Sequence, residues 1–186
     1  MNVPLGCTRL EVLPPDARLF VLTVRAWTTL ARCRRQQEAG LRKRACEVLK
    51  AFLMRAGITA GERLDALLAL LGRHAERPVW LGCPTCGAIS AGEKRLLAAC
   101  AAAMEGRNDT CRKLLAFWLT EDKLATATQL MLALAVALVE ADIRLQEKIA
   151  ARSMPLLAIL TIIENAPQIV RRRVAPTRRL GLRMEA

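Results

Sequence analysis

The chain of 186 residues has no tyrosine, a single histidine (His74) and two serines (Ser90 and Ser153). It also lacks the phosphate-binding Gly-rich loop with Lys-Ser/Thr and the Gly-x-Gly-x-x-Gly dinucleotide motif. Its carboxylates fall mostly at expected helix starts or beside basic residues, where capping and solvated ion pairs account for them. The sequence therefore predicts a protein that is not an enzyme.

An alternating strand pattern is also missing, and aromatic residues make up 3% of the chain. Apolar residues instead recur at spacings of three and four through most of the sequence, which is typical of amphipathic helices. Thr59 with Glu62 and Ser90 with Glu93 match the Ser/Thr-x-x-Glu capping box. We expect an all-α protein, a single helical bundle of about six or seven helices with a cysteine-containing turn and a basic C-terminal tail.

The length suits one domain. The first predicted helix begins at Asp16, and a short one begins at residue 108. The others cover residues 41–56, 59–74, 90–105, 120–152 and 155–165. Gly57 is expected to end the second of them. The predicted organisation is an N-terminal extension over residues 1–15, a helical domain over 16–166 and a basic C-terminal tail over 167–186.

The longest stretch without a charge covers residues 124–139. A membrane-spanning helix needs about 20 apolar residues, and this shorter stretch contains Thr126, Thr128 and Gln129. We expect a central helix that is buried all round in the bundle, and no membrane insertion.

The seven cysteines are an odd number, and no convincing signal peptide precedes them. A reducing cytoplasm fits this pattern best. Cys33 and Cys46 fall within helical apolar patterns and are expected to be small core residues.

Cys83 and Cys86 stand in the stretch Cys-Pro-Thr-Cys-Gly, for which three interpretations remain open. Two thiolates on one turn are half of a zinc site, with His74 as the third ligand and Cys100, water or a partner as the fourth. A redox pair needs its first cysteine at a helix N-terminus, and the Ser90 capping box places the helix start beyond Cys86. The third interpretation is a structural turn with free thiols. Zinc is the one cofactor that the sequence suggests.

The net charge of +12 is concentrated at the two ends. Residues 1–58 carry 11 basic and 4 acidic side chains, and residues 171–186 carry 6 and 1. Such asymmetry favours a polyanionic partner, either nucleic acid or anionic lipid, although a solvated face with a basic tail is the simpler alternative.

Arg18, Arg25 and Arg32 are spaced by seven, so on one helix they form a stripe almost along the axis. The predicted phosphate-contacting set adds Arg35, Arg42, Lys43, Arg44, Arg171, Arg172, Arg173, Arg178 and Arg179.

The functional expectation is a non-enzymatic, basic, helical binding protein with a regulatory role, which contacts nucleic acid mainly through phosphates. The alternative is an adaptor or regulator that presents an apolar helical groove to a protein partner or to a second copy. Peripheral contact with anionic lipid is left open, because electrostatics alone does not separate lipid from nucleic acid.

Overall fold

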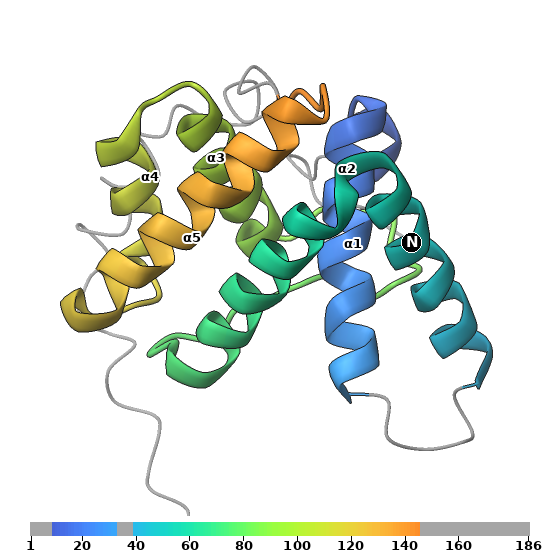
Figure 1. The fold of residues 1–186 in the computed structure, drawn as a ribbon. Helices are drawn as coiled ribbons and strands as arrows, with labels where there is room; N and C mark the ends of the chain where they lie inside the picture. Colours follow the sequence, from blue (N-terminus) through green and yellow to red (C-terminus); the bar gives the residue numbers. More distant parts are fainter. Residues whose placement is uncertain (1–8, 33–38, 146–186) are drawn as a thin grey trace, which may run out of the picture. The chain divides into compact units, whose positions relative to one another are not determined.

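The computed structural model describes residues 9–32 and 39–145, which form five α-helices and one short 3₁₀ helix (Figure 1). The elements follow in the order η1 (Leu10–Val12), α1 (Pro15–Arg32), α2 (Ala39–His74), α3 (Ala91–Met104), α4 (Asn108–Leu115) and α5 (Glu121–Glu140). Within these ranges there is no strand, and an isolated antiparallel bridge joins Arg9 to Ala88. The predicted all-α class is confirmed, whereas the predicted count of six or seven helices is not matched.

One merged element and one predicted helix outside the described residues account for the difference in count, and one further helix is shorter than predicted. The predicted helices 41–56 and 59–74 belong to one element, α2, which bends at Gly57 with φ 83° and ψ 164°. Glycine reaches this conformation because it has no Cβ to clash with the backbone. α5 ends at Glu140 rather than at 152, and Asp142 follows with a left-handed φ of 52°. The predicted helix 155–165 and the tail lie outside the described residues.

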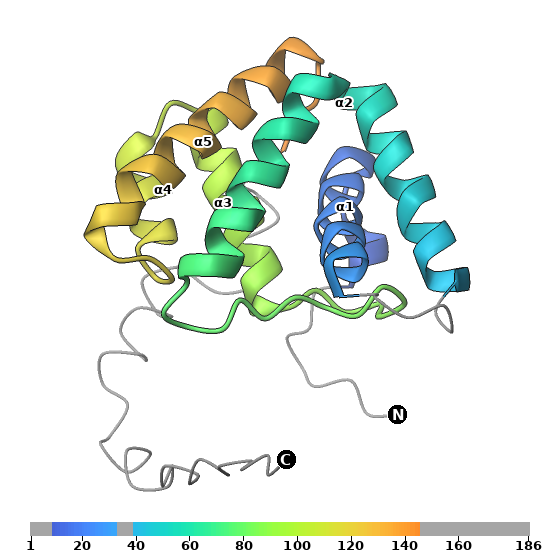
Figure 2. The ribbon, with the colours of Figure 1, turned by 60° about the horizontal axis from the view of Figure 1, so that its bottom comes forward.

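The helices pack around a core of aliphatic side chains and one tryptophan. α1 contacts α2, α2 contacts α5, and α3 contacts both α4 and α5. Figures 1 and 2 show α1 beside the first half of α2 and α5 beside its second half. The bend at Gly57 therefore allows α2 to pack against both neighbours. The core includes Leu67, Leu71, Leu96, Leu115, Trp118, Met131, Leu134 and Leu138.

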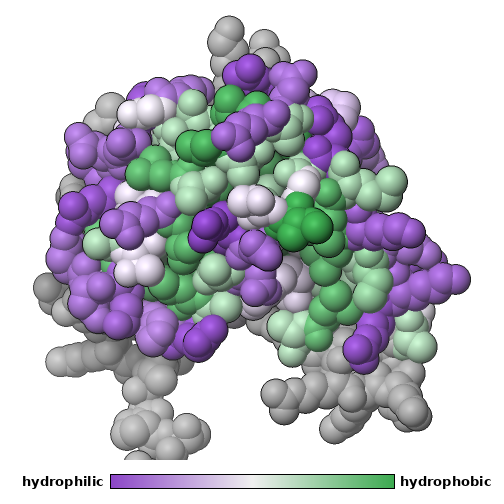
Figure 3. Space-filling view, in the orientation of Figure 1, coloured by the Kyte–Doolittle hydropathy of each residue, from purple (hydrophilic) through white to green (hydrophobic). Residues whose placement is uncertain are grey.

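α5 is apolar along most of its length, but only part of its surface is buried. One face is buried, through residues that include Leu124, Met131 and Leu138, while Val136 on the other face is 58% exposed. Figure 3 shows hydrophobic side chains on the face of the molecule along which α2 and α5 run. The prediction of a helix buried all round is therefore wrong, because α5 packs against α2, α3 and α4 but leaves Ala125, Gln129 and Val136 exposed in the described structure. Its length and mean hydropathy of 1.4 would also suit a membrane span, but a soluble core helix has the same properties.

Candidate binding site

The side chain of Arg25 on α1 is buried, with 1% of the residue exposed, and all five of its N–H donors have acceptors. Nε donates to Glu93 Oε1 at 2.6 Å, and Nη2 donates to Glu93 Oε2 at 2.9 Å and to the Ala88 carbonyl at 2.7 Å. Nη1 donates to the carbonyl oxygens of Cys83 at 3.2 Å and Cys86 at 2.5 Å. The prediction that Arg25 contacts phosphates is wrong, because its guanidinium faces the interior and has no donor left.

Glu93 carries the opposite charge of this pair at the start of α3, and its side chain is fully buried. Its carboxylate also accepts hydrogen bonds from the backbone N–H groups of Gly82 and Ser90, both at 2.8 Å. Ser90 Oγ accepts from Glu93 N at 3.1 Å, which confirms the predicted capping box, and donates to Trp80 O at 2.7 Å. Burial raises the pKa of Glu93, but the hydrogen bonds and the charge of Arg25 outweigh it and bring the pKa below its ordinary value.

Two glycines permit the loop over residues 80–90 to lie against this ion pair. A Cβ on Gly82 would come within 2.7 Å of Arg25 Nη2, and a Cβ on Gly92 would come within 2.3 Å of the Trp80 carbonyl oxygen. Real Cβ atoms do not approach other heavy atoms so closely. The loop therefore needs glycine at both positions to contact Arg25 and the start of α3.

Cys83 and Cys86 form a disulfide on the exposed side of the same loop, with their Cα atoms 5.2 Å apart. In this form neither sulfur is a thiolate, which is the species that binds zinc. His74 is exposed at the end of α2, and Cys100 is buried within α3. No three His, Cys, Asp or Glu side chains gather as a metal site within the described ranges. The zinc site is thus not assembled in the disulfide form and stays a prediction for the reduced chain.

The other thiols differ sharply in their surroundings. Cys100 and Cys111 are buried, whereas Cys46 is exposed on α2, contrary to the prediction that it belongs to the core. Burial raises the pKa of Cys100, and the neighbouring Cys111 raises it further. Burial also raises the pKa of Cys111 to about 11. Both buried thiols are therefore protonated and unreactive near neutral pH.

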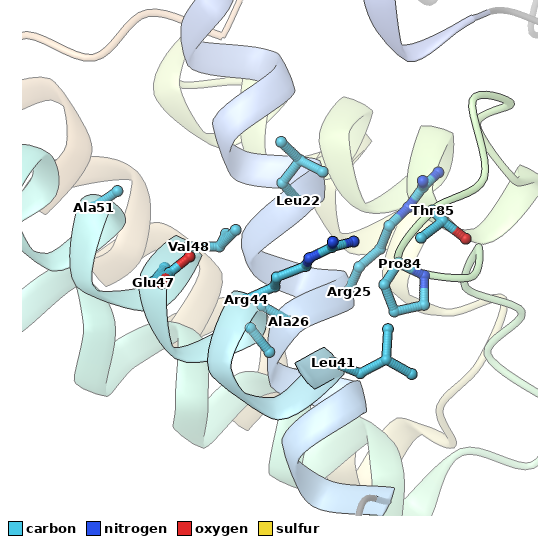
Figure 4. A pocket seen from close by; sticks show the side chains of 11 residues that line it. Leu22, Arg25, Ala26, Leu41, Arg44, Glu47, Val48, Ala51, Pro84 and Thr85 are labelled. Carbon is cyan, nitrogen blue, oxygen red and sulfur yellow. The ribbon is translucent and has the colours of Figure 1, made fainter. Parts of the chain in front are cut away.

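An open pocket of about 450 Å³ lies between α1, the first half of α2 and the cysteine loop (Figure 4). Besides Arg25, the charged residues that line the pocket are Arg44 and Glu47. Figure 4 shows Arg44 extending across the pocket toward the loop. Its apolar and loop lining comes mainly from Leu22, Ala26, Val48, Ala51, Pro84 and Thr85.

The remaining predicted basic residues do not form one stripe. Arg18 is half-buried on α1, whereas Arg42, Lys43 and Arg44 are exposed on the first half of α2. These three α2 residues make no ion pair with any residue that the structure describes. Of this α2 basic run, Arg42–Lys43–Arg44, Arg44 lines the pocket, and the other two residues precede it on the same helix. Outside the described part lie the side chain of Arg32 and the residues Arg35, Arg171, Arg172, Arg173, Arg178 and Arg179.

A second group of arginines covers the turn between α4 and α5. Arg95 lies 3.5 Å from the centroid of the Phe117 ring, and Arg77 lies 4.9 Å from the same centroid. Burial lowers the pKa of Arg95, and the charge of Arg77 acts in the same direction. These guanidiniums stack on an aromatic face next to the buried Trp118, a role that accounts for them without a ligand.

The sequence patterns did not reveal the pocket. Its apolar lining residues occupy ordinary helix positions, and nothing in their spacing separates a pocket from a packed contact. The one usable signal was the Cys-Pro-Thr-Cys-Gly stretch, since its central Pro84 and Thr85 line the pocket. Glu93 was recognised as a capping residue, but its partner Arg25 was not.

Comparison with known proteins gives no family to which the chain can be assigned. No family model matches it, and no curated protein or solved structure is significantly similar. The functional argument therefore rests on the pocket, the loop and the basic residues themselves.

Proposed function

We propose that the protein is a non-catalytic adaptor whose pocket receives an apolar side chain from an acidic segment of a partner protein. The observation that carries this proposal is the open, largely apolar pocket with Arg44 of the α2 basic run in its lining. This was the alternative function expected from the sequence, and the position of Arg25 now favours it over the first.

An apolar anchor suits the pocket because few free polar groups face it. Small-molecule sites orient their ligands with several convergent polar groups. Here the donors of Arg25 are all taken by Glu93 and by loop carbonyls, which leaves Arg44, Glu47 and Thr85 as the other polar side chains of the lining. Partner proteins commonly fill such pockets with one or two large apolar side chains, surrounded by weaker polar contacts.

Acidic character in the partner follows from the charges around the pocket. Arg42, Lys43 and Arg44 are exposed, and Glu47 is the acidic side chain among the pocket residues. The whole chain carries +12, so an acidic segment is also attracted at a distance. Charge complementarity of this kind accelerates association and selects among partners more than it adds affinity.

The test uses a labelled synthetic peptide of about 16 residues, with leucines at helical spacings of three and four and glutamates elsewhere. Fluorescence anisotropy measures its affinity for the full chain and for Ala51→Trp, which places a large ring in the pocket from an exposed position. We expect Ala51→Trp to weaken binding at least about ten-fold, and Ala125→Trp on the outer face of α5 to leave it unchanged. Equal affinity of the two variants would refute the proposal.

A charge-reversal pair tests the electrostatic part. Arg44→Glu should weaken binding of the same peptide, because the reversed charge lies in the pocket lining. Arg63→Glu makes the same change at an exposed position on the second half of α2, outside the lining, and should have a smaller effect. Effects of the same size would indicate attraction by net charge alone.

Phosphate contact with nucleic acid remains a second candidate function, because the α2 basic run is exposed and makes no ion pair with the residues that the structure describes. Each phosphate contact on duplex DNA contributes a slope of about 0.9 to the fall of log affinity with log salt. Replacing Arg42, Lys43 and Arg44 with glutamine should reduce this slope, and so should deletion of residues 171–186. Two unrelated duplexes should be affected alike, since phosphate contacts carry no sequence information. Salt-independent binding, or none, would remove this candidate.

A further inference from the structure

One wall of the pocket is a ring of four residues closed by the Cys83–Cys86 disulfide. Pro84 and Thr85, the two residues inside the ring, line the pocket. Both cysteines are exposed, so a thiol reagent can reach the bond from solvent. The disulfide therefore closes the same four-residue ring that forms this wall of the pocket.

Hydrogen bonds that do not involve sulfur also hold the two ends of this ring. Arg25 Nη1 donates to the carbonyl oxygens of Cys83 and Cys86, and Cys86 N donates to Cys83 O at 3.1 Å. The buried carboxylate of Glu93 keeps the guanidinium in place. Loss of the disulfide would leave the two ends attached to α1 and would free the residues between them.

We propose that the thiol–disulfide state of Cys83 and Cys86 controls occupancy of the pocket. This inference rests on the proposed function. In the oxidised chain the disulfide fixes Pro84 and Thr85 as a wall for the apolar anchor, and in the reduced chain that wall loosens and the partner binds more weakly. The fold stays intact in both states, because the network of Arg25 and Glu93 is independent of the sulfur atoms.

The switch needs a dithiol reductant, such as dithiothreitol in the experiment or a reduced dithiol protein in the cell. One thiolate of the reductant attacks a cysteine sulfur, the Cys83–Cys86 bond breaks, and a mixed disulfide forms. The second thiol of the reductant then resolves the mixed disulfide. Two electrons and two protons pass to the cysteines, which end as two thiols, and the reductant ends as a disulfide. Cys100 and Cys111 do not compete, because burial keeps them protonated.

The experiment compares the oxidised full chain with the chain reduced by dithiothreitol. Mass spectrometry after alkylation counts the thiols and should show two more in the reduced protein, at Cys83 and Cys86. Anisotropy with the acidic leucine peptide should show binding at least about five-fold weaker after reduction. The double variant Cys83→Ser/Cys86→Ser should bind like the reduced chain and ignore the reductant, whereas Cys46→Ser should keep the full response.

Hydrogen exchange and circular dichroism separate the possible failures. Reduction should accelerate exchange of the Cys86 amide, which donates to Cys83 O across the ring, while the helical spectrum stays unchanged. Equal peptide affinity in both states overturns the inference and leaves the proposed function standing. If the oxidised chain does not bind the peptide at all, the proposed function fails, and unchanged exchange at Cys86 then overturns the inference as well. Global loss of helix on reduction also overturns it.

Discussion

Arg25 and Glu93 are 68 residues apart in the sequence, yet their side chains meet at 2.6 Å in a place that solvent does not reach. The pair joins α1 to the start of α3, and its remaining hydrogen bonds hold the loop between them. Because every donor of the guanidinium has an acceptor, the charge is compensated and no phosphate or carboxylate ligand is needed to satisfy it.

Removing one charge of this pair should destabilise the protein strongly. Glu93→Gln keeps the volume of the side chain but leaves the charge of Arg25 buried without its counter-charge. We expect the free energy of unfolding in urea to fall by about 3–5 kcal/mol. Glu62→Gln, the same change at an exposed position on α2, is the control and should have little effect. Similar values for the two variants would mean that the buried pair contributes nothing specific.

Alanine at Gly82 should disturb the same network from the loop side. Its Cβ would lie 2.7–3.1 Å from three atoms of the Arg25 guanidinium, so the side chain must move and hydrogen bonds must lengthen. We expect a loss of about 1–3 kcal/mol in thermal or urea unfolding. Gly87→Ala, in the same loop, meets no atom within 4 Å and should be close to neutral. A neutral Gly82→Ala would show that the guanidinium has room that the structure does not indicate.

Stability should also fall in acid because of Glu93. A carboxyl whose pKa is lower in the folded state stabilises the protein above its unfolded pKa and loses this contribution as the pH falls through the folded pKa. We expect the unfolding free energy of the wild type to decrease below about the ordinary value of 4.5. Glu93→Gln lacks this titration and should decrease less over the same interval. The pKa of Asp122 is also lowered, mainly by a hydrogen bond from Thr120. Because both proteins contain Asp122, it does not contribute to the difference between their pH profiles. Parallel pH profiles would contradict the assignment.

The thiols should react in an order set by burial. At pH 8, iodoacetamide should modify Cys46 in the folded chain while Cys100 and Cys111 stay unmodified, because the latter are buried and their pKa values are raised. Unfolding in guanidinium chloride should make the buried pair reactive. Peptide mass spectrometry before and after unfolding gives the result at each cysteine. Early modification of Cys111 in the folded protein would show that α4 opens locally.

The sequence predicted features that depend on neighbouring residues. The capping box of Ser90 and Glu93 spans four positions, and its hydrogen bonds form as expected. Gly57 was correctly identified as an interruption, although the chain bends there and continues as α2. Such features depend on local backbone chemistry and need no knowledge of the tertiary fold.

The sequence did not predict which helix faces are buried. A spacing of seven places Arg18, Arg25 and Arg32 on one side of α1, but it cannot say whether that side meets solvent or a loop 60 residues away. The same applies to α5, where a continuous apolar run indicated burial on all sides and the structure covers one face. The partners of Arg25 come from distant parts of the chain, so only the tertiary fold could identify them.

Asp16, at the start of α1, accepts a hydrogen bond from Arg144 N at 3.2 Å and lies 3.9 Å from Arg55. Arg55 in turn donates to the carbonyls of Ala141 and Asp142, just after α5. Contacts between positions 128 apart form late in folding, because a long loop must close first. During synthesis α1 and the basic first half of α2 leave the ribosome well before Arg144 exists. The nascent chain therefore carries Arg55 without its acceptors at Ala141 and Asp142 until the end of α5 has been synthesised.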